Sequence, residues 1–299
     1  VSLRKPIHQT REEKVFAEIR VRFPGPQKTG DALTQALMAL GTFYHEQGRD
    51  DVAVPLWEKA IERSPDDAQA AFGLAQTYDG VGAWVSAVDY YKKAIELNPK
   101  NASTWNIVGL VLARMNKVDE AIECYDKAIS IDGKNSEAWY NKGSALGNLG
   151  KYDQAVTCYQ RAVDLAPKNE VAWNEYGAAF IKLHRYKESV QCFDKAILNR
   201  ADYPEAWFNK GKALELLGQH DESLKSYDRA LQIRAEYDEA WYEKGRRLSF
   251  LKRYEEAITS FQRAVKINAS YQNGWNEMGL TYLKVDNLNE ALGSFDKAI

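Results

Sequence analysis

Three cysteine thiols could do chemistry in this chain, because thiolates bind zinc and take part in redox reactions. Cys124, Cys158 and Cys192 follow one another at a constant interval, which would place them at equivalent points of a repeating structure. Equivalent side chains on packed helices are separated by roughly 10 Å, the distance between helix axes, whereas zinc binds a thiolate sulfur at about 2.3 Å. We therefore expect half-buried packing residues rather than a metal or redox site.

The other residues of catalytic type form no recognisable constellation. His8, His45, His184 and His220 are far apart in the sequence, and no two of them have the spacing of metal ligands on one helix. The 19 glycines contain no nucleotide-binding fingerprint. Because no nucleophile, base and orienting group can be combined from these residues, we expect a non-catalytic chain without metal or cofactor.

Composition limits the partners and the environment of the protein. The 299 residues carry 40 basic and 42 acidic side chains, a net charge of −2, so nothing predicts unspecific binding to nucleic acid or to an anionic membrane. No apolar stretch is long enough to span a bilayer. Three cysteines without paired spacing fit a reducing compartment, and we expect a cytoplasmic protein. The start at Val1 leaves a processed form with a removed targeting peptide as an alternative.

Tryptophan marks an internal repeat. Six of the eight tryptophans recur with the same constant interval as the cysteines: Trp105, Trp139, Trp173, Trp207, Trp241 and Trp275. Each is followed by a glycine on the next helical turn, and then by a small residue, an aromatic residue and an alanine at fixed distances. The frame continues without insertion from Thr34 to Ile299. The chain is therefore an array of one repeated structure rather than two unrelated domains.

Each repeat contains two stretches with the three- and four-residue period of an amphipathic helix. Between them lies a residue that tolerates a left-handed backbone: Gly48, Gly82, Asn116, Gly150, His184, Gly218, Lys252 and Asp286. Pro65, Pro99 and Pro167 end the second helix of their repeats, because proline lacks the next N–H donor. We expect a helical hairpin in which the glycine lets the helices approach and the aromatic residue fills the remaining space.

This pattern resembles the tetratricopeptide repeat family, whose helix–turn–helix unit is about 34 residues long. The resemblance implies an all-α fold, a right-handed superhelical solenoid of antiparallel helix pairs. We expect an N-terminal leader at 1–33 and eight repeats at 34–67, 68–101, 102–135, 136–169, 170–203, 204–237, 238–271 and, truncated, 272–299. Where Ala201, Ala235 and Ala269 replace the closing proline, the helix ends are predicted to be looser or shifted along the chain.

Both ends of the array depart from the repeat pattern. Within the leader, Val15, Phe16 and Ile19 follow a capping-box pattern and predict a short helix that caps repeat one; the alternative is a tail that folds into the groove or onto a partner. Pro55 predicts a late start or a kink in the second helix of repeat one. The array stops inside repeat eight without a polar capping helix, so self-association through this repeat is a further hypothesis.

In the tetratricopeptide family the first helices line a concave groove, and the resemblance implies which residues point into it. Position five of the repeats supplies Phe72, Asn106, Tyr140, Asn174, Phe208, Tyr242 and Asn276. Position six supplies Asn141, Glu175, Asn209, Glu243 and Glu277, and position nine supplies Lys212 and Arg246. Amide side chains bond the backbone of an extended peptide whatever its sequence, while aromatic rings supply apolar contact. These residues are candidates for a peptide-binding groove.

The charge of this surface suggests the kind of ligand. Glutamates at positions two and six outnumber the basic residues at position nine, so we hypothesise a preference for ligands that carry Lys or Arg. The alternative is a solvated face whose acidic side chains favour the helix N-termini. We expect a non-catalytic scaffold that binds an extended or helical peptide segment of a protein partner. The alternative function is a regulatory or substrate-docking repeat domain of a larger enzyme or signalling protein, with the catalytic part outside this chain.

Overall fold

The computed structural model describes residues 32–299, and every regular element in this range is an α-helix. The helices are α2 (Ala32–Glu46), α3 (Asp50–Arg63), α4 (Ala68–Gly80), α5 (Trp84–Leu97), α6 (Ala102–Arg114), α7 (Val118–Ile131), α8 (Ser136–Asn148), α9 (Tyr152–Leu165), α10 (Glu170–Lys182), α11 (Tyr186–Asn199), α12 (Pro204–Leu216), α13 (His220–Ile233), α14 (Asp238–Phe250), α15 (Tyr254–Ile267), α16 (Gln272–Lys284) and α17 (Leu288–Ala298). The predicted all-α fold of helix pairs is confirmed. The leader helix expected around Val15 lies outside the described residues.

The break inside each helix pair is a single residue with left-handed backbone. All eight positions predicted from the sequence have φ between 59° and 77°. At Gly150, for example, the N–H bonds the Gly147 carbonyl at 2.9 Å, and the N–H of Lys151 bonds the Leu146 carbonyl at 2.9 Å. These bonds satisfy carbonyl groups at the end of α8 and turn the chain directly into α9.

The two helices of a pair meet where a glycine faces an aromatic ring. A Cβ added to Gly177 of α10 would lie 2.7 Å from a ring carbon of Phe193 of α11, and Gly211 meets Tyr227 at 2.6 Å in the next pair. Both rings are fully buried. The predicted packing is confirmed: the absence of a side chain on the first helix makes room for the aromatic ring of the second helix.

In five of the first helices the tryptophan also bonds the turn that precedes the helix. The indole N–H of Trp173 donates to the carbonyl of Pro167 at 2.9 Å, and that of Trp207 donates to the carbonyl of Ala201 at 3.0 Å. This bond needs no proline. The three helices before the alanine turns, α11, α13 and α15, end whole repeat periods after α9, which precedes a proline turn, so the predicted shift of these ends is wrong.

Pro55 lies inside α3 without delaying its start. The helix begins at Asp50, one full repeat period before the start of α5 at Trp84, so the predicted late start is wrong. Proline removes the hydrogen bond that the carbonyl of Asp51 would accept. Because Asp51 is exposed, water can replace that bond.

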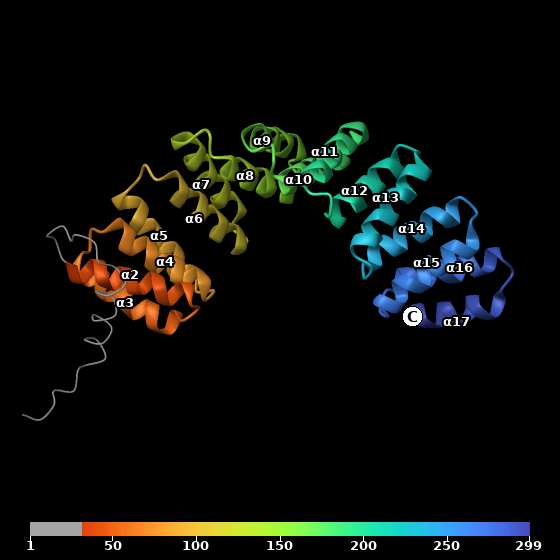
Figure 1. Ribbon diagram of the computed structural model, residues 1–299, viewed down its shortest axis with the longest axis horizontal. Helices are drawn as coiled ribbons and strands as arrows, with labels where there is room; N and C mark the ends of the chain where they lie inside the picture. Colours follow the sequence, from red (N-terminus) through yellow and green to blue (C-terminus); the bar gives the residue numbers. More distant parts are fainter. Residues whose placement is uncertain (1–31) are drawn as a thin grey trace, which may run out of the picture. The chain divides into compact units, whose positions relative to one another are not determined.

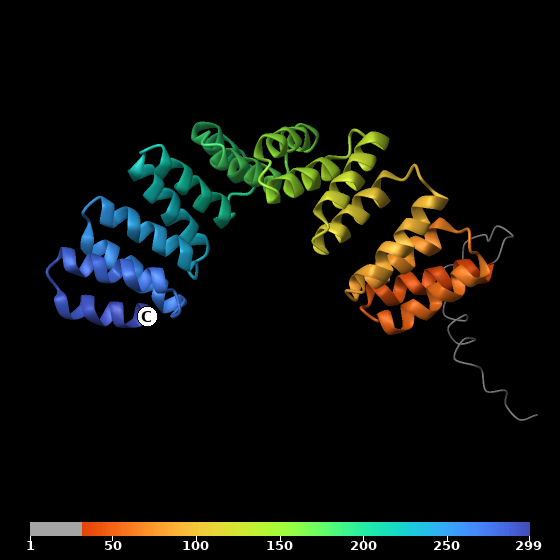
Figure 2. The ribbon, with the colours of Figure 1, turned by 180° about the vertical axis from the view of Figure 1, so that it is seen from behind.

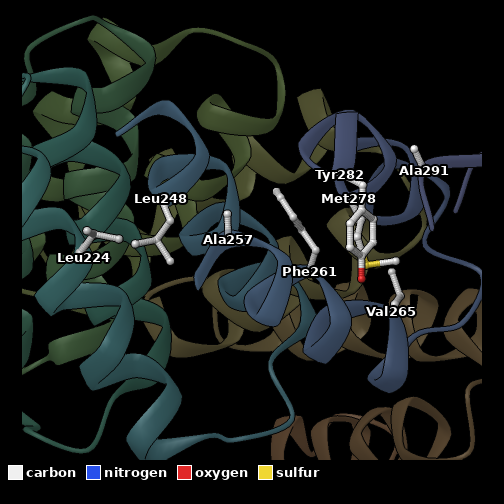
Figure 3. Close-up of a cluster of buried hydrophobic side chains, with 8 residues drawn as sticks. All are labelled: Leu224, Leu248, Ala257, Phe261, Val265, Met278, Tyr282 and Ala291. Atoms are coloured by element: carbon white, nitrogen blue, oxygen red, sulfur yellow. The ribbon is translucent and has the colours of Figure 1, made fainter. Parts of the chain in front are cut away.

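The chain divides into two compact parts, before and after the bond between Ala138 and Trp139. In the first part α3 packs between α2 and α4, around the buried ring of Trp57. In the second part, from α9 onward, each helix packs on its neighbours in sequence, as α14 and α15 do side by side (Figures 1 and 2). Figure 3 shows Val265 of α15 gathered with Met278 and Tyr282 of α16 in the core. Within the described range no helix is long and apolar enough to cross a bilayer.

Candidate functional site

The three equivalent cysteines, Cys124, Cys158 and Cys192, are packing residues. All three thiols are buried, more deeply than the half-buried placement predicted from the sequence. Desolvation raises the pKa of Cys124 to about 11 and that of Cys192 to about 12, so these thiols are protonated at neutral pH. Among residues 32–299 there is no group of three or more His, Cys, Asp or Glu side chains that could hold a metal ion.

Two of the described histidines, His45 and His184, lie at separate turns between helices. The Nδ1 atom of His45 lies 2.6 Å from a carboxylate oxygen of Asp50, beside the break between α2 and α3. His184 is itself the left-handed residue between α10 and α11, and its ring contacts the hydroxyl of Tyr186 at 2.7 Å. His220 begins α13, and its Nδ1 atom lies 3.3 Å from a guanidinium nitrogen of Arg247 on α14. These three histidines do not meet at one site, and His8 lies outside the described residues.

Position five of the repeats points largely into the protein. Asn106 and Asn174 are 4% exposed and Phe208 is 6% exposed, so the prediction that these three side chains line an open groove is wrong. Phe72, Tyr140 and Tyr242 are half-buried, and Asn276 is exposed.

The aromatic residues at position five are buried or half-buried because they pack on the core aromatic residue of their own repeat. The ring centroids of Tyr140 and Tyr159 are 5.9 Å apart, and those of Phe208 and Tyr227 are 5.8 Å apart. Such tilted contacts between aromatic rings add to the stability that burial provides. Position five is therefore a border between the core and the surface of the first helices.

Position six carries a row of polar side chains on the first helices of the second part. This polar row consists of Asn141, Glu175, Asn209, Glu243 and Glu277, all of them half-buried. The position-nine residues Lys212 and Arg246 beside it are exposed. Neighbouring first helices touch directly, since α10 packs on α12 and α14 packs on α16. The candidate residues that remain accessible are thus mainly polar.

Two asparagines and a glutamate form a hydrogen-bonded chain across α10 and α12. The side-chain amide of Asn209 donates to the side-chain oxygen of Asn174 at 3.1 Å, and Asn174 donates to a carboxylate oxygen of Glu175 at 3.1 Å. Desolvation raises the pKa of Glu175, and the bond from Asn174 offsets this in part. The buried amide of Asn174 therefore orients two members of the polar row instead of contacting a ligand itself.

At the other end of the polar row, Glu243 is paired with a basic residue of its own repeat. Arg246 bonds the carboxylate of Glu243 at 2.8 Å. Desolvation acts to lower the pKa of Arg246, but the carboxylates of Glu243 and Glu277 contribute to a net rise. Its guanidinium carbon also lies 5.9 Å from the centre of the Tyr242 ring. Arg246 thus pairs with Glu243 and offsets the negative charge of Glu277 only in part.

Three tyrosines beside the polar row were not identified from the sequence. Tyr203, Tyr237 and Tyr271 each precede a first helix, where Asn169 instead caps α10 by accepting a hydrogen bond from the N–H of Ala172 at 3.0 Å. The side chains of these tyrosines make no such cap. Loss of an N-cap hydrogen bond typically costs about 1 kcal/mol of stability.

Two of these tyrosines, Tyr237 and Tyr271, pack on side chains of position five. The ring of Tyr237 lies 5.0 Å from that of Phe208, and the ring of Tyr271 lies 4.9 Å from that of Tyr242. The three tyrosines follow one another at the interval of the repeat, so the period itself was the signal that could have found them.

Solved structures similar to this chain are arrays of the same kind. YrrB, described as a TPR protein with an unusual peptide-binding site, is 23% identical, with a TM-score of 0.54 over 62% of this chain and 95% of YrrB. A tetratricopeptide repeat protein from Parabacteroides merdae ATCC 43184 is 20% identical, with a TM-score of 0.62 over 77% of this chain and 91% of that protein. At these identities the likeness shows the fold.

Sequence comparison identifies the repeats themselves. A curated relative, cellulose synthase operon protein C of Xanthomonas axonopodis pv. citri (strain 306), is 44% identical over 43 residues, which are 14% of this chain and 3% of that protein. The model for subunit 3 of the anaphase-promoting complex, cyclosome, matches residues 46–128. Models of the tetratricopeptide repeat match residues 136–169, 171–203, 204–237 and 238–271, and a TPR repeat model matches 109–150. The chain belongs to the tetratricopeptide repeat family.

Proposed function

We propose that the second part of the chain, residues 139–299, binds an extended peptide segment of a protein partner along the polar row. The tetratricopeptide fold is that of a protein–protein interaction scaffold, and the family is generally non-catalytic. A scaffold of this kind holds its partner through a surface that the repeats present side by side.

The observation that carries the proposal is the hydrogen-bonded chain from Asn209 through Asn174 to Glu175. The Asn174 amide is nearly inaccessible and fixes the two neighbouring side chains, which are partly exposed. Side chains held in this way lose little conformational freedom when a ligand binds. The amide of Asn209 keeps a carbonyl oxygen and a second N–H that can bond the backbone of an extended peptide.

A peptide array tests the proposal on the full chain. Dodecapeptides of random sequence are screened for binding, and the affinity of the best binders is measured by fluorescence anisotropy. Asn209→Ala removes the amide from the polar row and is expected to weaken binding about fivefold to tenfold, the value of one hydrogen bond to a buried partner. Lys195→Ala on the second helix α11 is the matched control and is expected to leave the affinity unchanged. Binding that survives Asn209→Ala at full strength would place the ligand elsewhere.

A further inference from the structure

Glu175 is a member of the polar row that forms no ion pair with a basic side chain within residues 32–299. The carboxylate is half-buried, and its one hydrogen bond within residues 32–299 comes from the neutral amide of Asn174. The equivalent residue two repeats later, Glu243, is bonded by Arg246 from position nine of its own repeat. In the repeat of Glu175 that position holds Ala178. A partly desolvated carboxylate without a cation costs free energy that a cationic ligand would recover.

Three phenol rings from different elements lie within electrostatic reach of this carboxylate. Tyr140 lies on α8, Tyr159 on α9, and Tyr203 just before α12. Desolvation raises the pKa of all three tyrosines, and the negative charge of Glu175 raises each of them further. The rings of Tyr140 and Tyr159 are 5.9 Å apart. The faces of aromatic rings attract cations, most strongly where water is excluded.

The aromatic surroundings already hold a guanidinium group on another side. The guanidinium carbon of Arg200 lies 3.8 Å from the centre of the Tyr203 ring, while its charged nitrogen pairs with Glu170 at 3.2 Å. Arg200 therefore already covers Tyr203, which is 7% exposed, and leaves the half-buried ring of Tyr140 for a ligand. The ion pair of Arg200 is with Glu170 and not with Glu175. The carboxylate of Glu175 remains available to a second cation.

We propose that Glu175, with the half-buried ring of Tyr140, receives the side chain of a Lys or Arg residue in the bound peptide. The inference rests on the proposed function and names the chemistry of its ligand. The carboxylate supplies the charge and Tyr140 supplies aromatic contact along the aliphatic stem. Asn209, one repeat further along, bonds the neighbouring peptide backbone. The broader hypothesis, in which the glutamates at positions two and six select basic ligands, is thereby narrowed to Glu175, because Arg246 pairs with Glu243 and acts electrostatically on Glu277.

A binding cycle between protein and peptide tests this assignment. The probes are the dodecapeptides that bind the full chain most tightly, each compared with a version in which Lys is replaced by norleucine or Arg by citrulline. The protein variant is Glu175→Gln, which keeps the hydrogen bond to Asn174 and removes the charge. We expect each single change to weaken binding about tenfold and the combination to weaken it no further, since both remove the same ion pair.

Glu243→Gln is the control at the equivalent position. We expect no coupling between this change and the peptide cation, because Arg246 already occupies the carboxylate of Glu243. Circular dichroism shows whether each variant is folded. If Asn209→Ala weakens binding but Glu175→Gln does not couple to any peptide cation, the cation site is overturned and the peptide groove stands. If no dodecapeptide binds the unaltered chain, the proposed function falls and the cation site falls with it.

Discussion

Gly177→Ala probes the packing on which every helix pair depends. The added methyl group would lie 2.7, 2.9 and 3.0 Å from three ring carbons of Phe193, whereas ordinary contacts begin at 3.4 Å. The ring is fully buried and has no room to move aside. Overpacking of this kind costs about 1–3 kcal/mol, while alanine in a helix gains up to about 1 kcal/mol over glycine. We expect a net loss of up to about 2 kcal/mol.

Gly147→Ala is the matched control on the first helix of the preceding repeat. The nearest atom to its added methyl group is the hydroxyl of Tyr159 at 3.9 Å, an ordinary contact. Here only the gain in helix propensity applies, and we expect stabilisation of up to about 1 kcal/mol. Both substitutions add one methyl group to a helical glycine. The difference between their effects on the free energy of unfolding therefore isolates the contact with the aromatic ring.

Amide hydrogen exchange is the suitable assay, because repeats in an array open locally. Exchange is measured in α10 and α11 for Gly177→Ala, and in α8 and α9 for Gly147→Ala. Adding Phe193→Leu should reduce the cost of Gly177→Ala, since the smaller side chain leaves space for the methyl group. Exchange in α10 and α11 that slows as much as it does in the control would refute the close-packing account.

Three further predictions concern charged and titratable groups. Glu215→Ala strands the buried guanidinium of Arg247, so we expect a loss of about 3–5 kcal/mol in urea unfolding, most of it recovered by adding Arg247→Met. Because burial raises the pKa of Glu175 in the folded state, its charged form costs stability as pH rises through that pKa. Glu175→Gln should therefore raise the melting temperature at pH 7 and leave it unchanged below about pH 4, where the carboxyl group is neutral in both states; an equal effect at both values would contradict this. With the pKa of Cys192 at about 12, iodoacetamide at pH 8 should label Cys192 in the native chain at least about a hundredfold more slowly than in urea, and labelling at equal rates would show an accessible thiol.

Much of the fold follows from the sequence because the same residue types recur at equivalent positions of each repeat. The left-handed residues Asn116 and Lys252 were predicted from their place in the period, although neither is glycine, and both have φ of 61°. The aromatic partner of each glycine followed in the same way. The late start predicted from Pro55 was wrong because the other contacts of α3, including those of the buried Trp57, hold the helix in register.

The candidate site was less predictable, because repeat positions do not specify exposure. Asn174 and Asn276 occupy the same position, yet the first is buried beneath its neighbours and the second is exposed. The ion pairs of these side chains could likewise not be predicted from the sequence. Whether Glu175 or Glu243 carries uncompensated charge depends on position nine of the same repeat and on where that side chain points, which needs coordinates. The row of acidic residues could be predicted, but the ion pair between Glu243 and Arg246 could not.

The side-chain amide of Asn209 offers the most direct test of a peptide groove on this scaffold. The NMR signals of side-chain amides are recorded for the full chain while a dodecapeptide selected on the array is added. A peptide in the groove is predicted to shift the signal of Asn209, which reports on the polar row, and to leave that of Asn199 on the second helix α11 in place. Saturating binding with an unmoved Asn209 signal would contradict the account.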